Sequence, residues 1–131
     1  MSYGLGNELN MFEAALEAAD LAWWVIELPS GTVFFSENKT KMLGRKAKDF
    51  VHYSHFTDLL HKDDYDCAML AMTDHLTGKK PLYETKYRIK GANGKYRTFY
   101  DRGKIVGRDK KGGMTVAGIV MDITKYSPEN L

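Results

Sequence analysis

The stretch YETKYRIK, residues 83–90, carries a charged side chain at every second position. A period of two is typical of a β-strand with one buried face. Asn93-Gly94 follows shortly after, and Asn-Gly is the most favourable sequence for a tight hairpin turn. We therefore expect residues 96–106 to return beside the first strand. A near-continuous apolar run at 115–123 is expected at the centre of the same sheet.

Before these strands, the pattern changes to helical periods. Leu9, Phe12, Leu16 and Ala19 recur at spacings of three and four, which predicts an amphipathic helix over residues 7–19. A longer helix is expected to open at Asp63 and to stop at Gly78. Its apolar face is expected to comprise Tyr65, Ala68, Met69, Met72 and Leu76.

The remaining segments complete the order of elements. The run Pro29-Ser30-Gly31 predicts a hairpin turn between strands at 21–28 and 32–35. Short helices are expected at 37–43, 47–53 and 55–61. Together these elements predict an α+β fold: a five-stranded antiparallel sheet with helices on one face, preceded by an amphipathic cap helix.

Composition narrows the classes of function. The 131 residues fit one domain with a real core, and the longest apolar run is far too short to cross a bilayer. The single cysteine, Cys67, suits a reducing, cytoplasmic setting and is expected to be a small buried hydrophobe. All 19 lysines and arginines lie at or after Lys39, but they mostly alternate along strands. We therefore expect a solvated sheet face rather than contact with nucleic acid or membrane. No nucleophile or phosphate-loop motif predicts an enzyme.

Residues 20–124 resemble the PAS fold, in particular the branch found in bacterial and archaeal sensor histidine kinases. The resemblance is carried, in order, by Trp24-Val25-Ile26-Glu27-Leu28, Ser30-Gly31, Phe35-Ser36, Met42-Leu43-Gly44, His61-Lys62-Asp63-Asp64, Tyr87-Arg88-Ile89, Asn93-Gly94, Asp109-Lys110-Lys111-Gly112 and Gly118-Ile119-Val120-Met121-Asp122-Ile123-Thr124. Two positions depart from the pattern. Lys62 stands where the branch has proline, and Thr98, beside Phe99, stands where it often has tryptophan.

The resemblance implies a sensory module, without a catalytic site of its own, that signals to an output domain. A histidine kinase is the expected output. The alternatives are a GGDEF-type cyclase, a chemotaxis receptor, or a ligand-free interaction module whose core is filled by side chains. The resemblance predicts three segments: a cap and dimerisation helix at residues 1–19, the PAS core at residues 20–124, and the start of a linker to the effector domain at residues 125–131.

Three sets of residues follow from this interpretation. The set expected to line or fill a pocket between sheet and helices comprises Trp24, Ile26, Met42, Phe50, Phe56, Leu59, Met69, Met72, Tyr87, Thr98, Phe99, Ile119 and Met121. The expected signal relay at the exit is Asp122, Ile123 and Thr124. A homodimer is expected to form through Met11, Phe12, Ala15 and Leu16, with the helix also covering the outer sheet face. The sequence does not decide which of Trp23 and Trp24 faces the pocket.

No cofactor is favoured. His75 is the candidate axial ligand for haem, but it is expected instead to pack near the helix end. Cys67 lies outside a flavin-photocycle motif, so photocycle chemistry is not expected. Non-covalent flavin binding stays open, because it needs stacking and amide contacts rather than a motif. His61 with Asp63 and Asp64 suggests a metal site, but helix capping accounts for the two aspartates more simply.

Overall fold

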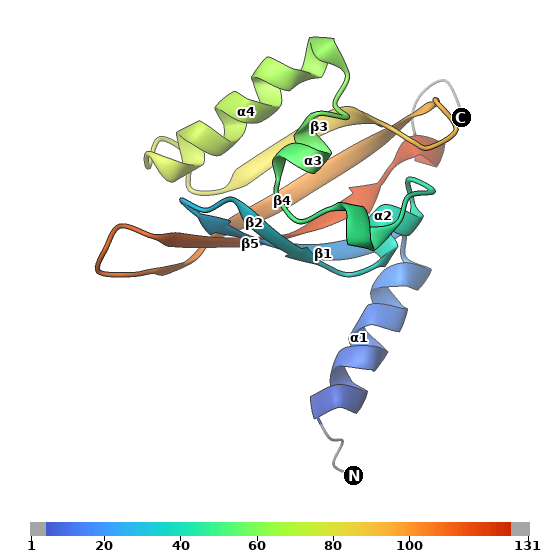
Figure 1. Cartoon of the computed structure of the whole chain (residues 1–131), viewed down its shortest axis with the longest axis horizontal. Helices are drawn as coiled ribbons and strands as arrows, with labels where there is room; N and C mark the ends of the chain where they lie inside the picture. The colour runs from blue at the N-terminus through green and yellow to red at the C-terminus, as the bar shows by residue number, and fades with distance from the viewer. Residues whose placement is uncertain (1–4, 127–131) are drawn as a thin grey trace.

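A computed structural model describes residues 5–126. Figure 1 shows an open sheet with helices over one side and an N-terminal helix that projects away from the sheet. In chain order the longer elements are α1 (Leu5–Ala18), β1 (Leu21–Leu28), β2 (Thr32–Phe35), α2 (Asn38–Lys41), α3 (Ser54–Thr57), α4 (Lys62–Leu76), β3 (Tyr83–Lys90), β4 (Tyr96–Arg108) and β5 (Met114–Asp122). Short 3₁₀ turns span Ala47–Asp49 and Thr124–Tyr126.

The five strands form one antiparallel sheet in the order β2-β1-β5-β4-β3. The last strand therefore lies at the centre, between the first strand and the long hairpin of β3 and β4. This position agrees with its apolar sequence, because a central strand has no edge exposed to water. The fold class and the order of elements predicted from the sequence are confirmed.

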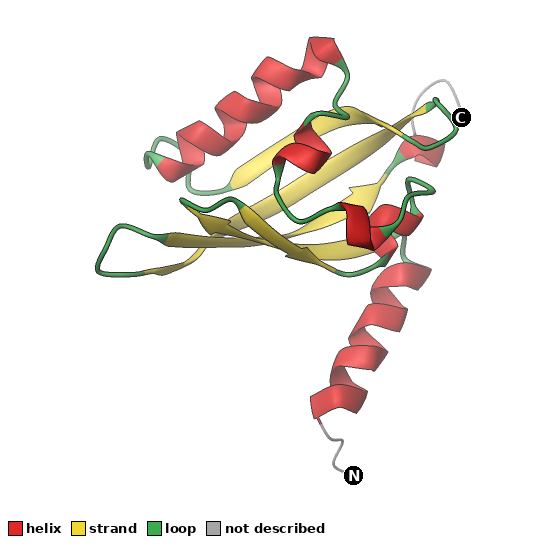
Figure 2. Ribbon diagram, viewed as in Figure 1, coloured by secondary structure: helices red, strands yellow, loops and turns green. Residues whose placement is uncertain are grey.

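The helices α3 and α4 lie over one face of the sheet, which we call the inner face (Figure 2). The core is formed between them and the sheet by buried side chains from all layers: Ala22, Trp24, Val33, Leu43, Phe50, Phe56, Tyr83, Tyr87, Ile89, Phe99, Val116 and Val120. Helix α4 is fixed at its start by Asp64, whose carboxylate accepts hydrogen bonds from Arg88 Nε and Nη2 at 2.8 and 2.9 Å. These bonds with Arg88 hold the pKa of the Asp64 carboxyl below its usual value.

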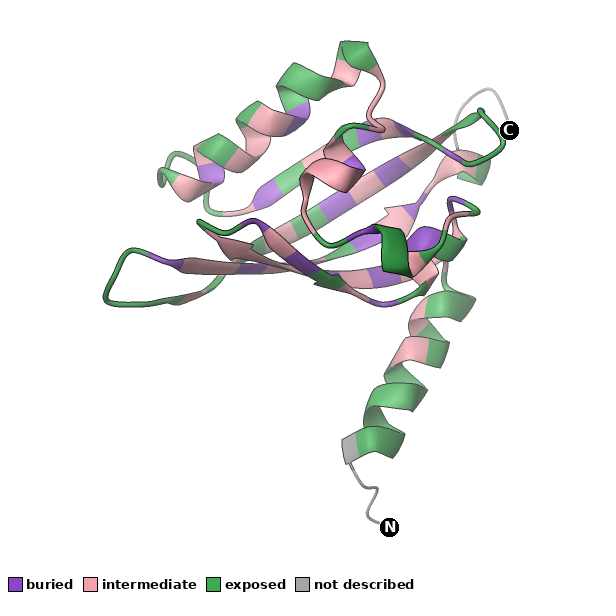
Figure 3. Ribbon diagram, in the orientation of Figure 1, coloured by how far each residue is buried: buried purple, intermediate pink, exposed green. Residues whose placement is uncertain are grey.

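Helix α1 forms as expected, but it does not cover the opposite, outer face of the sheet. It projects from the domain, and Figure 3 shows it mostly exposed along its length. Phe12 is 69% exposed and Met11 is 54% exposed, whereas Leu16 is half-buried. The expectation that this helix covers the outer face is therefore wrong for the single chain. Most of its apolar stripe lies in solvent.

Two expectations for α4 are also wrong. Cys67 is exposed rather than buried, and Tyr65 is 39% exposed rather than part of the inner stripe. The inward stripe starts one turn later, at Ala68. In the first turn of α4 it is Asp64 that contacts the sheet, accepting a hydrogen bond from Arg88 N of β3 at 2.8 Å. Within residues 5–126, no helix has the length and apolar character needed to span a membrane.

Candidate ligand pocket

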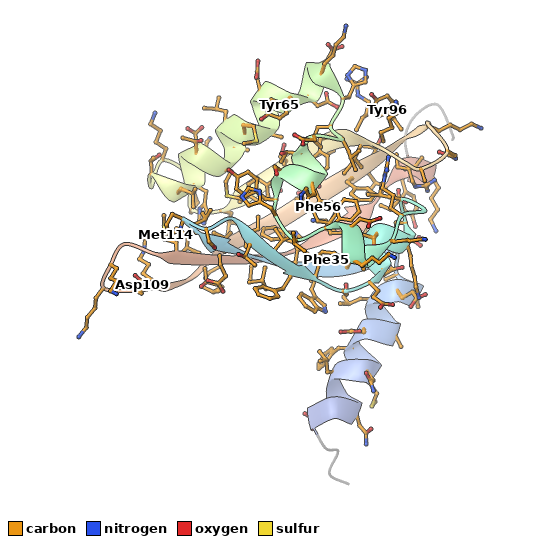
Figure 4. The ribbon with its side chains drawn as sticks, in the orientation of Figure 1. Phe35, Phe56, Tyr65, Tyr96, Asp109 and Met114 are labelled. Atoms are coloured by element: carbon orange, nitrogen blue, oxygen red, sulfur yellow. The ribbon has the colours of Figure 1, made fainter. Side chains whose placement is uncertain are left out.

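A cavity of about 250 Å³ lies between α4 and the inner face of the sheet. Its wall is mostly apolar. The lining residues are Trp24, Ile26, Leu28, Val33, Lys39, Tyr53, Phe56, Thr57, Leu60, Ala68, Met69, Met72, Thr73, Leu76, Tyr83, Tyr87 and Asp101. Figure 4 shows Phe56 beneath α3, on the side of the sheet that the helices cover. A largely apolar, concave space with a few convergent polar groups is the usual form of a small-molecule site.

The indole of Trp24 lies in a trough formed by two glycines that face each other across β4 and β5. Gly103 and Gly118 are directly paired in the register, and Trp24 pairs with Gly118 from the other side. A Cβ atom on Gly118 would come within 2.4 Å of Trp24 Cζ2 and 2.3 Å of the Arg102 carbonyl oxygen. Because neither glycine has a side chain, the indole can lie flat over β5 and β4 on the inner face, where its Nε1 reaches Asp101.

Asp101 is the acceptor at the centre of a buried polar cluster. Its carboxylate accepts hydrogen bonds from Trp24 Nε1 at 3.1 Å, Tyr87 Oη at 2.6 Å and Tyr83 Oη at 3.5 Å. Only 4% of Asp101 is exposed. Burial raises the pKa of the Asp101 carboxyl, while the charge of Lys39 and the three donors oppose that rise. Burial together with the Asp101 charge raises the pKa values of Tyr83 and Tyr87 well above 10, so both phenols stay neutral donors.

Lys39 brings a cation to the same cavity from α2. Its side chain lies over the ring of Phe56, with Nζ 3.8 Å from the ring centroid, and 8% of the residue is exposed. Burial lowers the pKa of the Lys39 ammonium to about 8, and the nearby Asp101 charge opposes this shift. A buried lysine is rare unless it has a partner, so its position in the cavity wall calls for a functional explanation.

The structure brings together about half of the residues predicted to form the pocket. Trp24, Ile26, Phe56, Met69, Met72 and Tyr87 line it. Met42, Phe50, Leu59 and Phe99 belong to the hydrophobic core that surrounds it. Of the two adjacent tryptophans, Trp24 faces the cavity, and Trp23 lies on the outer face.

Three of the predicted pocket residues are on the wrong face. Ile119 pairs with Trp23, and Met121 pairs with Leu21, so both project from the outer face. Ile119 is 38% exposed. Thr98 precedes the inward-facing Phe99 and therefore points outward as well, because side chains alternate along a strand. Phe99, which is fully buried, fills the inner position at this point of β4.

Sequence reasoning missed Lys39, Asp101 and Tyr83. Tyr83 could have been found, since it shares the period-two pattern with Tyr87. Asp101 falls on the same side of its strand as Phe99, so the alternation could have placed it inward. Lys39 carried no such signal, because a lysine in a four-residue helix is usually solvated.

The end of β5 is fixed by a second polar cluster. Asp122 is buried, and its Oδ2 accepts a hydrogen bond from Arg97 Nε at 2.5 Å. The other oxygen accepts from Thr124 Oγ1 at 2.6 Å, and Thr98 N donates to the same threonine hydroxyl at 2.9 Å. The chain is thus held against β4 where it leaves the sheet. The end of the expected linker, 127–131, lies outside the described residues.

The histidines singled out as ligands have other roles in the structure. Ile105 N donates to His75 Nε2 at 2.9 Å, and His75 Nδ1 lies 3.0 Å from the carbonyl oxygen of Lys80. Both ring nitrogens are thereby engaged in holding the end of α4. His61 caps the start of α4 by accepting from Asp63 N at 3.0 Å. No group of three or more His, Cys, Asp or Glu side chains suited to a metal occurs among residues 5–126.

Comparison with known proteins agrees with this architecture. Residues 32–120 match the family described as PAS fold. A sensory box histidine kinase/response regulator from Burkholderia thailandensis superposes with a TM-score of 0.71 at 22% identity, covering 88% of this chain and 86% of that one. The N-terminal domain of a diguanylate cyclase with PAS/PAC sensor from Marinobacter aquaeolei gives 0.71 at 18% identity, with 81% and 97% covered. No curated protein matches the sequence.

A domain of a putative light and redox sensing histidine kinase from Haloarcula marismortui is also similar. It superposes with a TM-score of 0.69 at 18% identity, covering 88% of this chain and 99% of that chain. At these identities the likeness concerns the fold. The similar structures come from proteins of different kinds, among them a histidine kinase and a diguanylate cyclase.

Proposed function

Since the chain belongs to the PAS family, we propose that it is a sensory module that binds a small molecule in the cavity under α4 and passes the signal to an output domain. PAS domains are generally regulatory rather than catalytic. The observation that carries the proposal is the cavity itself, which has an apolar wall and two buried charged side chains, Lys39 and Asp101. Two methionines of α4 add a flexible surface that adapts to ligand shape.

The proposed exit for the signal is Asp122, Ile123 and Thr124. Asp122 joins β5 to β4 through Arg97, and Thr124 joins the same two strands through Thr98 N. Phe99, next to Thr98, packs near Tyr87 of the cavity, with 6.2 Å between ring centroids. A shift of the sheet on ligand binding would therefore reach the residues that lead into the linker.

We place the dimer contact on α1, through Met11, Phe12, Ala15 and Leu16. The argument is the exposed apolar stripe, since a helix of 14 residues that packs against little else is marginal alone in water. A two-fold axis would bring the same stripe of a second copy against it. The outer face supplies adjoining apolar surface at Phe34 and Ile119, which are 53% and 38% exposed.

The output domain is proposed to be a histidine kinase in the cytoplasm. A diguanylate cyclase is the first alternative, because PAS structures similar to this chain come from proteins of both kinds. A chemotaxis receptor is a further alternative. A ligand-free interaction module is the competing hypothesis of a different class, and the cavity argues against it.

Native mass spectrometry of the purified protein, with an absorbance scan, tests the proposal. We expect a bound small molecule that leaves on denaturation, without a haem Soret band or flavin absorbance. A protein that carries nothing, and that neither gains stability nor changes its spectra with a library of small organic molecules, would favour the interaction module instead.

A further inference from the structure

The side chain of Lys39 is buried without an acceptor of its own. Among residues 5–126, no hydrogen bond or ion pair reaches Lys39 Nζ, although 8% of the residue is exposed. The ammonium rests on the face of Phe56, which attracts a cation but accepts no conventional hydrogen bond. Every fully buried side-chain nitrogen or oxygen among the described residues has a hydrogen-bond partner, so the unpaired Nζ keeps some accessible surface in the cavity wall. Its three N–H donors are therefore available to a ligand.

Asp101, the carboxylate whose charge acts on Lys39, is already engaged. Asp101 accepts from Trp24, Tyr83 and Tyr87, and it lies beyond ion-pair distance of Lys39 Nζ. It acts on Lys39 through its charge, which only partly offsets the effect of burial on the lysine pKa. A cationic ligand would find Asp101 occupied by three donors and would be repelled by Lys39. A ligand with an anionic group would instead supply the acceptor that Lys39 lacks.

The rest of the cavity determines the remainder of such a ligand. Opposite the polar cluster the wall consists of aliphatic and thioether side chains, among them Ile26, Leu28, Met69, Met72 and Leu76. The volume of about 250 Å³ lies just below the usual range for organic ligands, roughly 300–1,000 Å³. The space therefore suits a small molecule with an apolar body and one charged end.

We propose that the ligand of this domain is a small amphipathic organic anion whose carboxylate binds Lys39 Nζ and whose apolar body packs against the methionines of α4. This inference rests on the proposed sensory function and adds the chemical class of the ligand to it. Lys39 is then the residue that selects for charge. Asp101 accepts hydrogen bonds from Trp24, Tyr83 and Tyr87 and so holds these three side chains in place in the cavity wall.

Isothermal titration calorimetry with octanoate and octanamide at pH 7 tests the inference, since the two probes differ in charge but not in chain length. The wild-type protein is expected to bind octanoate about tenfold or more tightly than octanamide, the value of one charge-assisted hydrogen bond. Lys39→Met is expected to abolish that preference while keeping apolar contact with Phe56. Lys41→Met, two residues along the same helix and at an exposed position, is the matched control and should retain the preference.

Circular dichroism and thermal unfolding establish that each variant is folded. The inference is overturned if wild type binds the two probes equally, if it binds neither, or if Lys39→Met keeps the preference for octanoate. Equal binding of octanoate and octanamide by wild type would leave the ligand pocket standing and remove only the anionic class. A native mass spectrum showing a bound neutral or cationic molecule would do the same.

Discussion

The two faces of the sheet differ most clearly at two adjacent residues of β1. Trp24 is 3% exposed, crosses two glycines and donates to Asp101 at 3.1 Å. Trp23 is half-buried on the outer face and donates to Glu13 of α1 at 3.3 Å. The same type of side chain thus lines a cavity with a polar cluster on one face and contacts a projecting helix on the other. The inner face is covered by helices of the same chain, whereas the outer face keeps exposed apolar side chains, among them Phe34 and Ile119.

The largest effect is expected at the glycine trough of the inner face. Gly118→Ala places a Cβ against the Arg102 carbonyl and the Trp24 ring at 2.3 and 2.4 Å, and the backbone cannot move aside without breaking the strand pairing. We expect a loss of more than about 3 kcal/mol in the free energy of unfolding, at the upper end for overpacking. Urea unfolding measures it. Gly107→Ala is the matched control, because its nearest neighbour is 3.8 Å away on Thr115. Equal losses of stability in the two variants would contradict the claim that Gly118 is required for the close approach of the Trp24 ring.

The second-largest effect is expected from the buried Lys39, which should make the free energy of unfolding depend on pH. The pKa of Lys39 falls from 10.5 to about 8 on folding, so between pH 8 and 10.5 the unfolded chain holds a proton that the folded chain has lost. The free energy of unfolding of wild type should therefore rise across this window relative to Lys39→Met, by about 3 kcal/mol. Below pH 8 the difference should be constant.

The groups that face Lys39 are common to both proteins in this comparison. Asp101 approaches from β4, and Tyr83 and Tyr87 approach from β3, with phenol pKa values well above 10. Chemical unfolding of the two proteins at intervals between pH 7 and 10.5 supplies the measurement. Parallel curves would mean that the ammonium of Lys39 is hydrated in the folded protein.

Replacing each tryptophan tests the difference between the faces directly. Trp24→Phe removes a buried hydrogen bond and part of a buried ring, and we expect a loss of about 2 kcal/mol. Trp23→Phe removes a half-exposed contact with Glu13 and should cost less than about 1 kcal/mol. Thermal or urea unfolding of both variants decides. A larger loss for Trp23 would reverse the assignment of the two faces.

The smallest effect on the stability of the single chain is expected on α1. Phe12→Ser changes a side chain that is 69% exposed, so the free energy of unfolding of the monomer should move by less than about 0.5 kcal/mol. Self-association should nevertheless weaken, as it should on deletion of residues 1–19. Light scattering over a concentration series measures it, with Glu8→Ser on the same helix as a control. Unchanged masses for both Phe12→Ser and the truncated chain would remove α1 as the dimer contact.

The sequence predicted the strands well, because their periods and turns are local. Charged and uncharged side chains alternate along residues 83–90, and Asn93-Gly94 predicts a turn. The structure has both features, as strand β3 and its hairpin with β4. The faces of β1 and β5 were harder to predict. Trp23 and Trp24 are equally apolar, and β5 has apolar residues on both faces. In these strands the alternation of side chains therefore does not indicate which face is buried. Ile119 and Met121 were misassigned for this reason.

Alternation could have placed Tyr83 and Asp101 on the inner face, but local pattern could not predict that they form a polar cluster there. A charged residue is expected in water unless its partner is known, and the donors to Asp101 come from β1 and β3, far along the chain. Lys39 lies near Asp101 only after α2 has packed against the sheet. Asp122 likewise finds its partner on the neighbouring strand, where Arg97 lies 25 residues earlier in the chain.

The most direct test of the central claim, that the cavity under α4 is the sensory site, uses the methionine methyl groups as reporters. In a protein labelled with ¹³C at these methyls, titration with octanoate is expected to shift Met69 and Met72, which line the cavity. Met121, on the outer face, and Met11, on α1, should stay unchanged. Shifts confined to Met11 and Met121, with Met69 and Met72 unmoved at saturation, would contradict the account and place binding on the outer face.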